Sequence, residues 1–535
     1  MGKLRDDRAK IEFGDFQTPV ELAAAVCKRL SASGLSPRSI VEPTCGVGNL
    51  LFAALSTFPN CQTALGTDIN ADYVRQARAR LGSHEGNVRV MIESSDFFNR
   101  DWSTEISQLP TPLLFIGNPP WVTNSDLGSL RSKNLPAKAN DQKMKGLDAL
   151  TGKSNFDISE WMLCRLFTWL DGRRATVAML CKSAVARKAL VFGWTAKLRI
   201  QSASICRIDS AKHFKAAVDA CLLIVDLGTT ASATACPIYP DLESTTPDSV
   251  FALRDNMLVA DVSLYDRRKG LIGDSRNMWR SGIKHDCASL MEMVASDGHY
   301  ENGDGELLDL EERFLYPMLK SSDIARKGVP SPRRKMLVTQ TFVGEDTHQI
   351  EQVAVKTWNY LHRHRDRLAR RASSIYKGKP AFSIFGVGDY TFAPWKVAIS
   401  GLYKRLEFKV IGPHDGKPVV LDDTCYFLAC KTEEEARFLA KLLASPAAQE
   451  FFTAFVFWDA KRPITADILR RLDFKRLAAL LGLASEYEQH CMSAPLPAVP
   501  RQGQLELLSN VVPAISRRRL VPAAKRISGS RSESS

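Results

Sequence analysis

Short apolar runs alternate with amphipathic stretches along residues 16–225. Six runs are rich in aliphatic and β-branched residues and have the length of strands: 39–41, 63–68, 88–92, 112–117, 176–180 and 220–225. Residues 50–55 and 73–81, which lie between such runs, are typical of helices. Strands separated by helices predict βαβ units, and therefore an α/β fold with a mostly parallel sheet and helices on both faces. In such a sheet, ligands bind at the carboxyl ends of the strands.

The pattern changes after residue 228. Residues 228–248 are rich in Thr, Ser, Ala, Pro and Asp, which favours a domain boundary there. Beyond it, short aromatic runs at 382–385 and 408–411 predict strands, and residues 432–443 predict a helix. From residue 493, Pro, Ser and Arg dominate, which is typical of a disordered basic tail. We therefore predict three parts, at residues 1–230, 231–490 and 491–535.

Composition indicates a globular protein of a reducing compartment. The chain has 535 residues, of which 45% are hydrophobic, and no apolar run approaches the roughly 20 residues of a membrane-spanning helix. The charged residues 1–7 are followed by no apolar stretch, so we expect no secretory signal and a cytoplasmic location. The 12 cysteines are scattered singly, without a CxxC pair, which favours neither a zinc ribbon nor a redox site.

The net charge is +13, from 72 basic and 59 acidic residues. Such an excess favours a polyanionic partner, either nucleic acid or a membrane surface. The excess is concentrated in residues 359–379 and in the last twenty residues. On a helix over residues 360–371, four arginines would lie near one face and could neutralise phosphates: Arg363, Arg367, Arg370 and Arg371. The alternative is a basic helix that faces only solvent.

Residues 42–48 follow the first predicted strand. Gly46 and Gly48 would let the backbone turn sharply and approach a ligand closely, although a GxG can also be an ordinary tight turn. Leu51 occupies the third glycine position of the dinucleotide fingerprint, so the motif is not of that class. The one GKS, at residues 152–154, lacks the first glycine of a P-loop.

Two acidic residues follow the next two strands. Asp68 lies 20 residues after Gly48 and could accept the hydroxyls of a ribose, or it could cap a helix. Asp96 could accept from an adenine amino group, with Phe97 or Phe98 stacking on the ring. The alternative for the two phenylalanines is core packing.

The motif at residues 117–121, Gly-Asn-Pro-Pro-Trp, ends the fourth strand. Its two prolines fix the backbone and remove two N–H donors. The Asn118 side-chain carbonyl and the Pro119 backbone carbonyl could then both accept hydrogen bonds from one amino group. Trp121 offers a flat face for stacking on a planar base. The alternative is a surface turn.

This ordered set resembles the amino-group, S-adenosylmethionine-dependent DNA methyltransferases, in which the cofactor motifs precede the catalytic motif and target recognition comes last. The resemblance implies a Rossmann-like methyltransferase domain with a mostly parallel seven-stranded sheet (residues 1–230), a C-terminal α+β target-recognition domain (231–490), S-adenosylmethionine as cofactor and double-stranded DNA as substrate. It implies that the cofactor is held by Phe16, Gln17, Thr18, Pro19, Glu42, Pro43, Thr44, Cys45, Gly46, Gly48, Asp68, Ile69, Asp96, Phe97 and Asn118.

By the same resemblance, the target base is bound by Asn118, Pro119, Pro120 and Trp121, and Phe214 stacks on its other face. The alternative for Phe214 is core packing. Residues 385–390, 395–396 and 459–463 look like the recognition region of stand-alone adenine-N6 enzymes, which adds Lys396, Lys461 and Arg462 as DNA contacts. The similarity covers roughly residues 14–480. Residues 122–154, with six basic and three acidic residues, are either a loop that orders over DNA or a disordered insert.

Asparagine at position 118 favours adenine over cytosine, since cytosine-N4 enzymes commonly have serine there. The expected reaction is direct transfer of a methyl group to N6 of a flipped-out adenine in duplex DNA, without a cysteine nucleophile or a metal. The resemblance further implies a restriction-modification or defence system, in which a separate endonuclease or defence partner would act. The alternatives are an enzyme that methylates RNA or a protein amide nitrogen, and a non-catalytic DNA-binding subunit.

Overall fold

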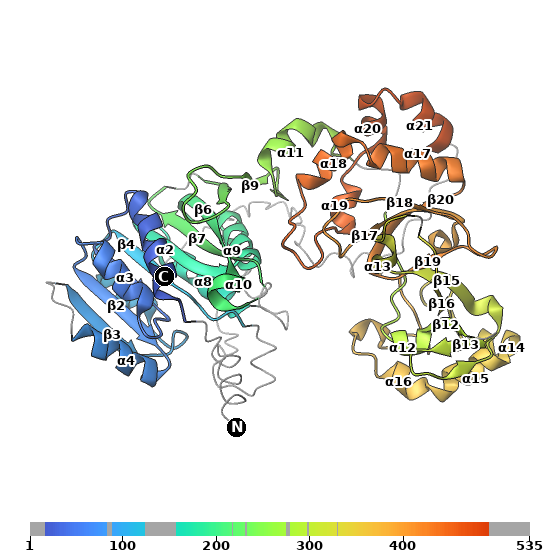
Figure 1. Cartoon of the computed structure of the whole chain (residues 1–535), viewed down its shortest axis with the longest axis horizontal. Helices are drawn as coiled ribbons and strands as arrows, with labels where there is room; N and C mark the ends of the chain where they lie inside the picture. The colour runs from blue at the N-terminus through green and yellow to red at the C-terminus, as the bar shows by residue number, and fades with distance from the viewer. Residues whose placement is uncertain are drawn as a thin grey trace, which may run out of the picture. The chain divides into compact units, whose positions relative to one another are not determined.

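The fold was determined as a computed structural model, which describes residues 17–82, 88–122, 157–216, 218–230, 233–273, 279–296, 299–328 and 330–491 (Figure 1). The chain divides into a unit of residues 1–493 and a second unit of residues 494–535. Phe16, the polar segment after Val122 and the predicted tail beyond Cys491 lie outside the described residues.

The first half of the chain forms a ten-stranded sheet in the order β10-β9-β8-β6-β7-β5-β4-β1-β2-β3. Its strands are β1 (Ser39–Glu42), β2 (Thr63–Asp68), β3 (Arg89–Ser94), β4 (Leu113–Gly117), β5 (Ala175–Lys182), β6 (Ile200–Ile208), β7 (Ala220–Leu227), β8 (Ala235–Tyr239), β9 (Ser249–Arg254) and β10 (Met257–Val259). Strands β1 to β5 pair in parallel, whereas β7 is antiparallel to β5 and β6.

The prediction of a mostly parallel sheet is confirmed for β1–β5, but the predicted number of seven strands is too small. The first seven strands form the predicted group, and β8, β9 and β10 extend the sheet beside β6. The Ser- and Pro-rich stretch at 228–248 therefore lies partly within the sheet, because β8 pairs in parallel with β6.

Helices cover both faces of this sheet: α2 (Val20–Ala32), α3 (Asn49–Thr57), α4 (Ala71–Leu81), α5 (Trp102–Gln108), α8 (Ile158–Trp169), α9 (Ser183–Thr195) and α10 (Ser210–Phe214). Strand β4 shows the reason, because its side chains alternate between two buried cores. Leu114 and Ile116 pack with residues of α2, α3 and α4, whereas Leu113 and Phe115 pack with residues of α5, α8 and α9. Both faces of the strand are buried, as expected for a parallel sheet.

Strand β1 lies between β2 and β4. Strands β2 and β3 therefore follow on one side of β1, and β4 and β5 on the other side. Adjacent crossovers that leave in opposite directions open a crevice at the carboxyl ends of the strands. The loops after β1, β2, β3 and β4, which carry the predicted motifs, all end at this edge.

The second half of the chain contains two further sheets. A four-stranded antiparallel sheet has the order β11-β20-β17-β18 and a six-stranded mixed sheet the order β14-β13-β12-β16-β15-β19. Their strands are β11 (Arg280–Ser281), β12 (Glu292–Ser296), β13 (His299–Asn302), β14 (Leu307–Leu308), β15 (Leu315–Leu319), β16 (Arg334–Leu337), β17 (Trp395–Ser400), β18 (Lys409–Ile411), β19 (Val420–Leu421) and β20 (Cys425–Cys430).

The main helices of this half are α11 (Val262–Arg268), α12 (Ala288–Met291), α13 (Ser321–Ile324), α14 (Gln349–Val353), α15 (Val355–Arg363), α16 (Arg365–Ala369), α17 (Glu433–Leu443), α18 (Pro446–Thr453), α19 (Ala466–Arg470), α20 (Phe474–Leu480) and α21 (Ala484–Cys491). The predicted helix at 432–443 and strand at 408–411 are confirmed as α17 and β18. The predicted strand at 382–385 is wrong. Left-handed backbone at Phe382 and Gly386 interrupts the extended run and leaves one isolated bridge, between Phe385 and Lys284.

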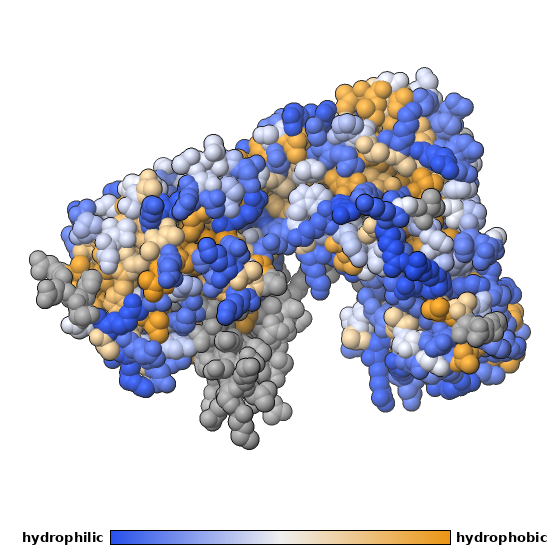
Figure 2. Space-filling model, in the orientation of Figure 1, coloured by the Kyte–Doolittle hydropathy of each residue, from blue (hydrophilic) through white to orange (hydrophobic). Residues whose placement is uncertain are grey.

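The face of the molecule in Figure 2 is mainly hydrophilic, with apolar patches such as the one over α20, where Leu480 is exposed. Among the described residues, none of the helices has the length and apolar character needed to cross a membrane.

Candidate active site

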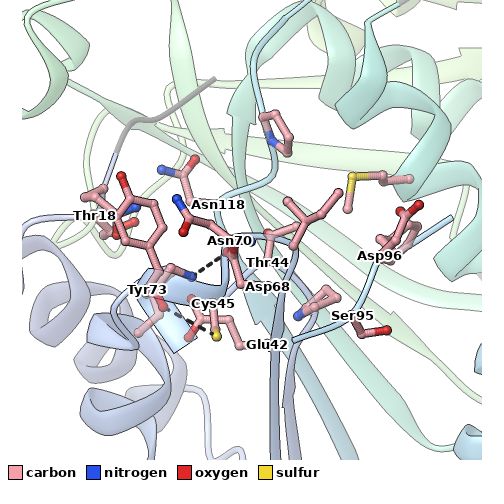
Figure 3. Close-up of a pocket in the computed structure, with 18 of the residues that line it drawn as sticks. Thr18, Glu42, Thr44, Cys45, Asp68, Asn70, Tyr73, Ser95, Asp96 and Asn118 are labelled. Atoms are coloured by element: carbon pink, nitrogen blue, oxygen red, sulfur yellow. Dashed lines mark hydrogen bonds between the residues drawn. The ribbon is translucent and has the colours of Figure 1, made fainter. Parts of the chain in front are cut away.

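A pocket lies at the carboxyl edge of the first sheet (Figure 3). It joins segments that are far apart in sequence: the residues just before α2, the loops after β1, β2, β3 and β4, and the first turns of α8. The predicted residues in its lining are Gln17, Thr18, Glu42, Pro43, Thr44, Cys45, Gly46, Asp68, Ile69, Asp96, Phe97, Asn118 and Pro120. The structure therefore places the predicted motifs around one cavity.

The loop after β1 needs glycine at two positions. Gly46 and Gly48 have φ values of +51° and +83°, which L side chains rarely adopt. A Cβ atom at Gly46 would collide with the Gln17 side chain, and one at Gly48 would lie 2.7 Å from the Phe52 ring. Gln17 also accepts a hydrogen bond from the Val47 N–H, at 3.3 Å, so the start of α2 is tied to this loop.

Glu42 is the buried acid of the site. Its side chain is 3% exposed, and Oε2 accepts a hydrogen bond from the Leu51 N–H at 2.8 Å. Leu51 lies in the first turn of α3, so the carboxyl satisfies one of the free N–H groups of that helix terminus. Burial raises the pKa of Glu42 well above its ordinary value of 4.5; the Leu51 hydrogen bond opposes this rise, and the Asp68 carboxylate adds to it.

This raised pKa predicts a pH-dependent stability. A carboxyl whose pKa is higher in the folded than in the unfolded chain stabilises the fold below about pH 4.5, and that contribution is lost as the pH rises through the folded-state pKa. We expect the melting temperature of the wild type, relative to that of Glu42→Gln, to fall as the pH rises. Thermal unfolding of both proteins over one pH series measures this difference, with the exposed Glu21→Gln as control. A pH-independent difference would contradict the prediction.

Asp68 fixes the loop with both carboxylate oxygens. Oδ2 accepts from the Gly46 N–H and Oδ1 from the Asn70 N–H, each at 2.8 Å. The helix α4 is capped by Asn70, which accepts from the Asp72 N–H at 2.9 Å, so the alternative that Asp68 is the N-cap is wrong. Asp68 therefore joins the loop after β1 to the loop after β2.

Asp96 and the two phenylalanines form the turn after β3. Asp96 accepts from the Phe98 N–H at 2.9 Å and from the Asn99 side chain at 2.6 Å. Phe97 is 5% exposed and packs on Trp102, with ring centroids 5.4 Å apart, so core packing applies to it. Both phenylalanines nevertheless contribute to the pocket lining.

The Asn-Pro-Pro-Trp motif has one end in the pocket and the other in the core. Asn118 and Pro120 line the pocket, whereas Trp121 is 6% exposed and its indole N–H donates to the Leu180 carbonyl at 3.3 Å. The centroids of the Phe214 and Trp121 rings lie 5.0 Å apart, and the ring planes meet at an angle of 68°. The structure thus brings together two aromatic residues that are 93 positions apart, although both are largely buried and neither belongs to the pocket lining.

The pocket also contains residues that sequence reasoning missed. Pro19, Gly48, Pro119, Trp121 and Phe214 do not line it, whereas Phe98, named as the alternative to Phe97, does. Eight further lining residues were not predicted: Asn49, Leu50, Asn70, Tyr73, Ser95, Val122, Ile158 and Met162. Asn70 and Tyr73 could have been found from their position just after Asp68. Ile158 and Met162 carry no such signal, because a long segment separates them from the motif.

The predicted continuous basic helix is wrong. Helix α15 ends at Arg363 and α16 begins at Arg365. Arg363 forms an ion pair with Glu306, and Arg367 forms one with Asp304. Both arginine side chains are nevertheless exposed, at 63% and 52%, and the break at residue 364 means that the four arginines do not lie on one continuous helix.

The other predicted DNA contacts differ in exposure. Arg371 donates to the carbonyls of His285 and Ser383, at 3.1 and 2.7 Å, while Arg370 is exposed. Lys461 and Arg462 are also exposed. Lys396 is buried: its side-chain nitrogen donates to the Ala393 carbonyl at 2.6 Å, and burial lowers its pKa to about 7. A buried amine of this kind presents no charge to the surface.

Comparison with known proteins gives the family. No protein-family model matches the chain. The type II methyltransferase M.NspV of Nostoc sp. is 44% identical over 479 residues, which are 89% of this chain and 99% of that protein. The type II methyltransferase M.XamI of Xanthomonas campestris pv. amaranthicola is 29% identical over 117 residues, 22% of this chain and 21% of the relative. The solved structure of the type IIL restriction-modification enzyme MmeI in complex with DNA is 13% identical, with a TM-score of 0.48, and the match covers 92% of this chain and 70% of that one. The extent of the first match shows that this chain belongs to the type II DNA methyltransferases of restriction-modification systems, which use S-adenosylmethionine as methyl donor.

Proposed function

We propose that the protein transfers the methyl group of S-adenosylmethionine to the N6 amino group of an adenine in duplex DNA. The observation that carries this proposal is the position of Asn118 in the pocket that also contains Asp68 and Asp96 (Figure 3). The loops after β1, β2 and β3 would bind the cofactor in this pocket. An amino group bound by Asn118 would therefore lie in the same cavity as the cofactor.

The pocket fits the chemistry of S-adenosylmethionine. Gly46 lacks the Cβ atom that would fill the space beside Gln17, and the Asp68 carboxylate lies in the pocket lining, where its oxygens are of the type that accepts hydrogen bonds from ribose hydroxyls. Asp96 and Phe97 would hold the adenine, and Gln17, Thr18 and the loop at 42–46 the methionine part. The bound cofactor supplies an electrophilic methyl group on a sulfonium.

The protein's contribution to the reaction is the orientation of the amine. The lone pair of an exocyclic amine is delocalised into the ring, which makes it a poor nucleophile. Two acceptors, the Asn118 side-chain carbonyl and the Pro119 backbone carbonyl, would draw the amino group toward tetrahedral geometry and localise the lone pair. Because positive charge develops on this nitrogen, acceptors aimed at it favour the transition state. Alignment of amine and methyl group supplies the remaining rate enhancement.

The target base must leave the duplex to reach this site. We assign the stacking on the flipped base to Trp121 and Phe214, whose rings lie in contact beside the pocket residues Asn118 and Pro120. Their burial means that a side-chain adjustment accompanies entry of the base.

We assign catalysis to the domain predicted at residues 1–230, whose sheet continues to Val259, and target recognition to the residues that follow, up to 490. Five of the predicted DNA contacts are exposed and accessible to phosphates: Arg363, Arg367, Arg370, Lys461 and Arg462. A cognate restriction endonuclease is the partner that this function implies.

The deciding experiment mixes purified protein with labelled S-adenosylmethionine and unmethylated genomic DNA, followed by nucleoside analysis by mass spectrometry. We expect labelled N6-methyladenine. N4-methylcytosine would keep the mechanism and refute the choice of base. Label in RNA or protein, and none in DNA, would refute the substrate. Binding of the cofactor without any transfer would support a non-catalytic DNA-binding subunit instead.

A further inference from the structure

We propose that Lys182 is a positioning residue for the Asn-Pro-Pro-Trp motif, holding its downstream end through the Trp121 carbonyl. The Lys182 side-chain nitrogen donates to the Trp121 carbonyl oxygen at 2.9 Å and to Asp157 Oδ2 at 2.7 Å. Its effect on methyl transfer rests on the proposed function, whereas its effect on the motif's backbone does not.

The motif needs an external support because of its own chemistry. Pro119 and Pro120 have no N–H groups, so this stretch cannot be fixed by donating backbone hydrogen bonds. Upstream, β4 is held in the sheet, where Gly117 is in register with Met179 of β5. Downstream, the direction of the Pro119 carbonyl depends on how Trp121 and Val122 are held.

Three of the hydrogen bonds between described residues hold that downstream end. The Trp121 indole donates to the Leu180 carbonyl at 3.3 Å, and the Val122 carbonyl accepts from the Ile158 N–H at 3.1 Å. The third is the bond from Lys182. Because this donor is charged, its bond to the Trp121 carbonyl is stronger than one between neutral groups. Lys182 ends β5, two residues after Leu180, so one strand holds both the ring and the carbonyl of Trp121.

Asp157 connects Lys182 to helix α8, which forms part of the pocket wall. Its side chain is 9% exposed, and Oδ1 accepts from the Ser159 N–H at 3.1 Å, which caps α8. The other oxygen accepts from Lys182. Because Ile158 and Met162 of α8 line the pocket, one lysine links the acceptor motif to the helix that closes the cavity beside it.

A neighbouring ion pair provides a control. Lys188 of α9 pairs with Glu160 of α8 at 2.8 Å, and the Lys188 side chain is 61% exposed. The Lys182–Asp157 pair joins the end of β5, just before α9, to the N-cap of α8, whereas Lys188 and Glu160 lie within the helices and do not line the pocket. A general loss of contact between α8 and α9 should affect both lysine variants, whereas a positioning role should affect only Lys182.

The test compares Lys182→Met with Lys188→Met by hydrogen–deuterium exchange and by steady-state kinetics. We expect faster amide exchange at Trp121 and Val122 in Lys182→Met alone, and a kcat about 10- to 100-fold lower, since small misplacements of reacting groups cost up to about 100-fold. The affinity for S-adenosylmethionine and the KM for DNA should stay near the wild-type values.

If Lys182→Met fails to fold, Lys182→Gln replaces it, because a neutral amide can still contact Asp157 while the charged donor to the Trp121 carbonyl is removed. Lys182→Arg should recover part of the rate by restoring a charged donor. Unchanged exchange at Trp121 and Val122 in a folded variant would overturn the proposal. The exchange readout needs no DNA, so a wild-type protein that fails to methylate DNA would refute the proposed function without deciding the role of Lys182.

Discussion

Asn118→Ala is expected to lower kcat for methyl transfer by about 100- to 1000-fold, the usual loss when one preorganised group that stabilises developing charge is removed. The Asn118 side chain reaches the pocket from the end of β4, and alanine removes its carbonyl acceptor while leaving both prolines in place. The Pro119 carbonyl remains, so some transfer should persist. Single-turnover methylation of DNA with labelled cofactor measures the chemical step directly.

The controls for this variant separate chemistry from binding. The affinity for S-adenosylmethionine, measured by calorimetry, should change little, because the loops after β1, β2 and β3 remain intact. Asn60→Ala is the matched surface control, since Asn60 is exposed in the loop before β2, donates to the exposed Ser36 hydroxyl and lies outside the pocket lining. A single-turnover rate within about threefold of wild type would remove Asn118 from the mechanism.

The chemistry near the pocket was predictable because it is local in sequence. Each of the first four strands ends at the same sheet edge. A motif that directly follows one of these strands must therefore lie at that edge. Asp68 and Asn118 could be placed at this edge from the amino-acid sequence alone. Phe214 could be proposed only from a resemblance. Its contact with Trp121 depends on β7 lying next to β5, and local sequence patterns do not predict the order of strands in a sheet.

Features that depend on distant partners escaped prediction. Strand β6 was missed because polar residues such as Gln201 and Arg207 interrupt its apolar side. The ion pairs of Arg363 and Arg367 could not be predicted, because their acidic partners lie 57 and 63 residues away in the sequence. Lys396 stands in a short stretch that resembles a recognition motif, but β17 is an inner strand of its sheet, which buries the lysine.

The second large effect is expected for Asp68→Ala, which should weaken binding of S-adenosylmethionine by about 100-fold or more. Two hydrogen bonds from ribose hydroxyls to a carboxylate are worth about 1.5–3 kcal/mol each, and each 1.4 kcal/mol corresponds to a factor of about ten in affinity. The variant also releases the Gly46 and Asn70 N–H groups that Asp68 holds at 2.8 Å, so the loop loses its preorganisation. Calorimetric titration of each protein with the cofactor measures the loss.

Asp72→Ala is the matched control, because Asp72 lies in the first turn of α4, is 67% exposed and pairs with Arg75 outside the pocket lining. The two contributions of Asp68 can be separated with a cofactor analogue that lacks both ribose hydroxyls. If the carboxylate binds the hydroxyls, the wild type should discriminate strongly between cofactor and analogue, and Asp68→Ala should bind both with nearly equal affinity. If the variant still discriminates as the wild type does, Asp68 acts only by holding the Gly46 loop, and the ribose must be bound by another side chain of the pocket, such as Tyr73.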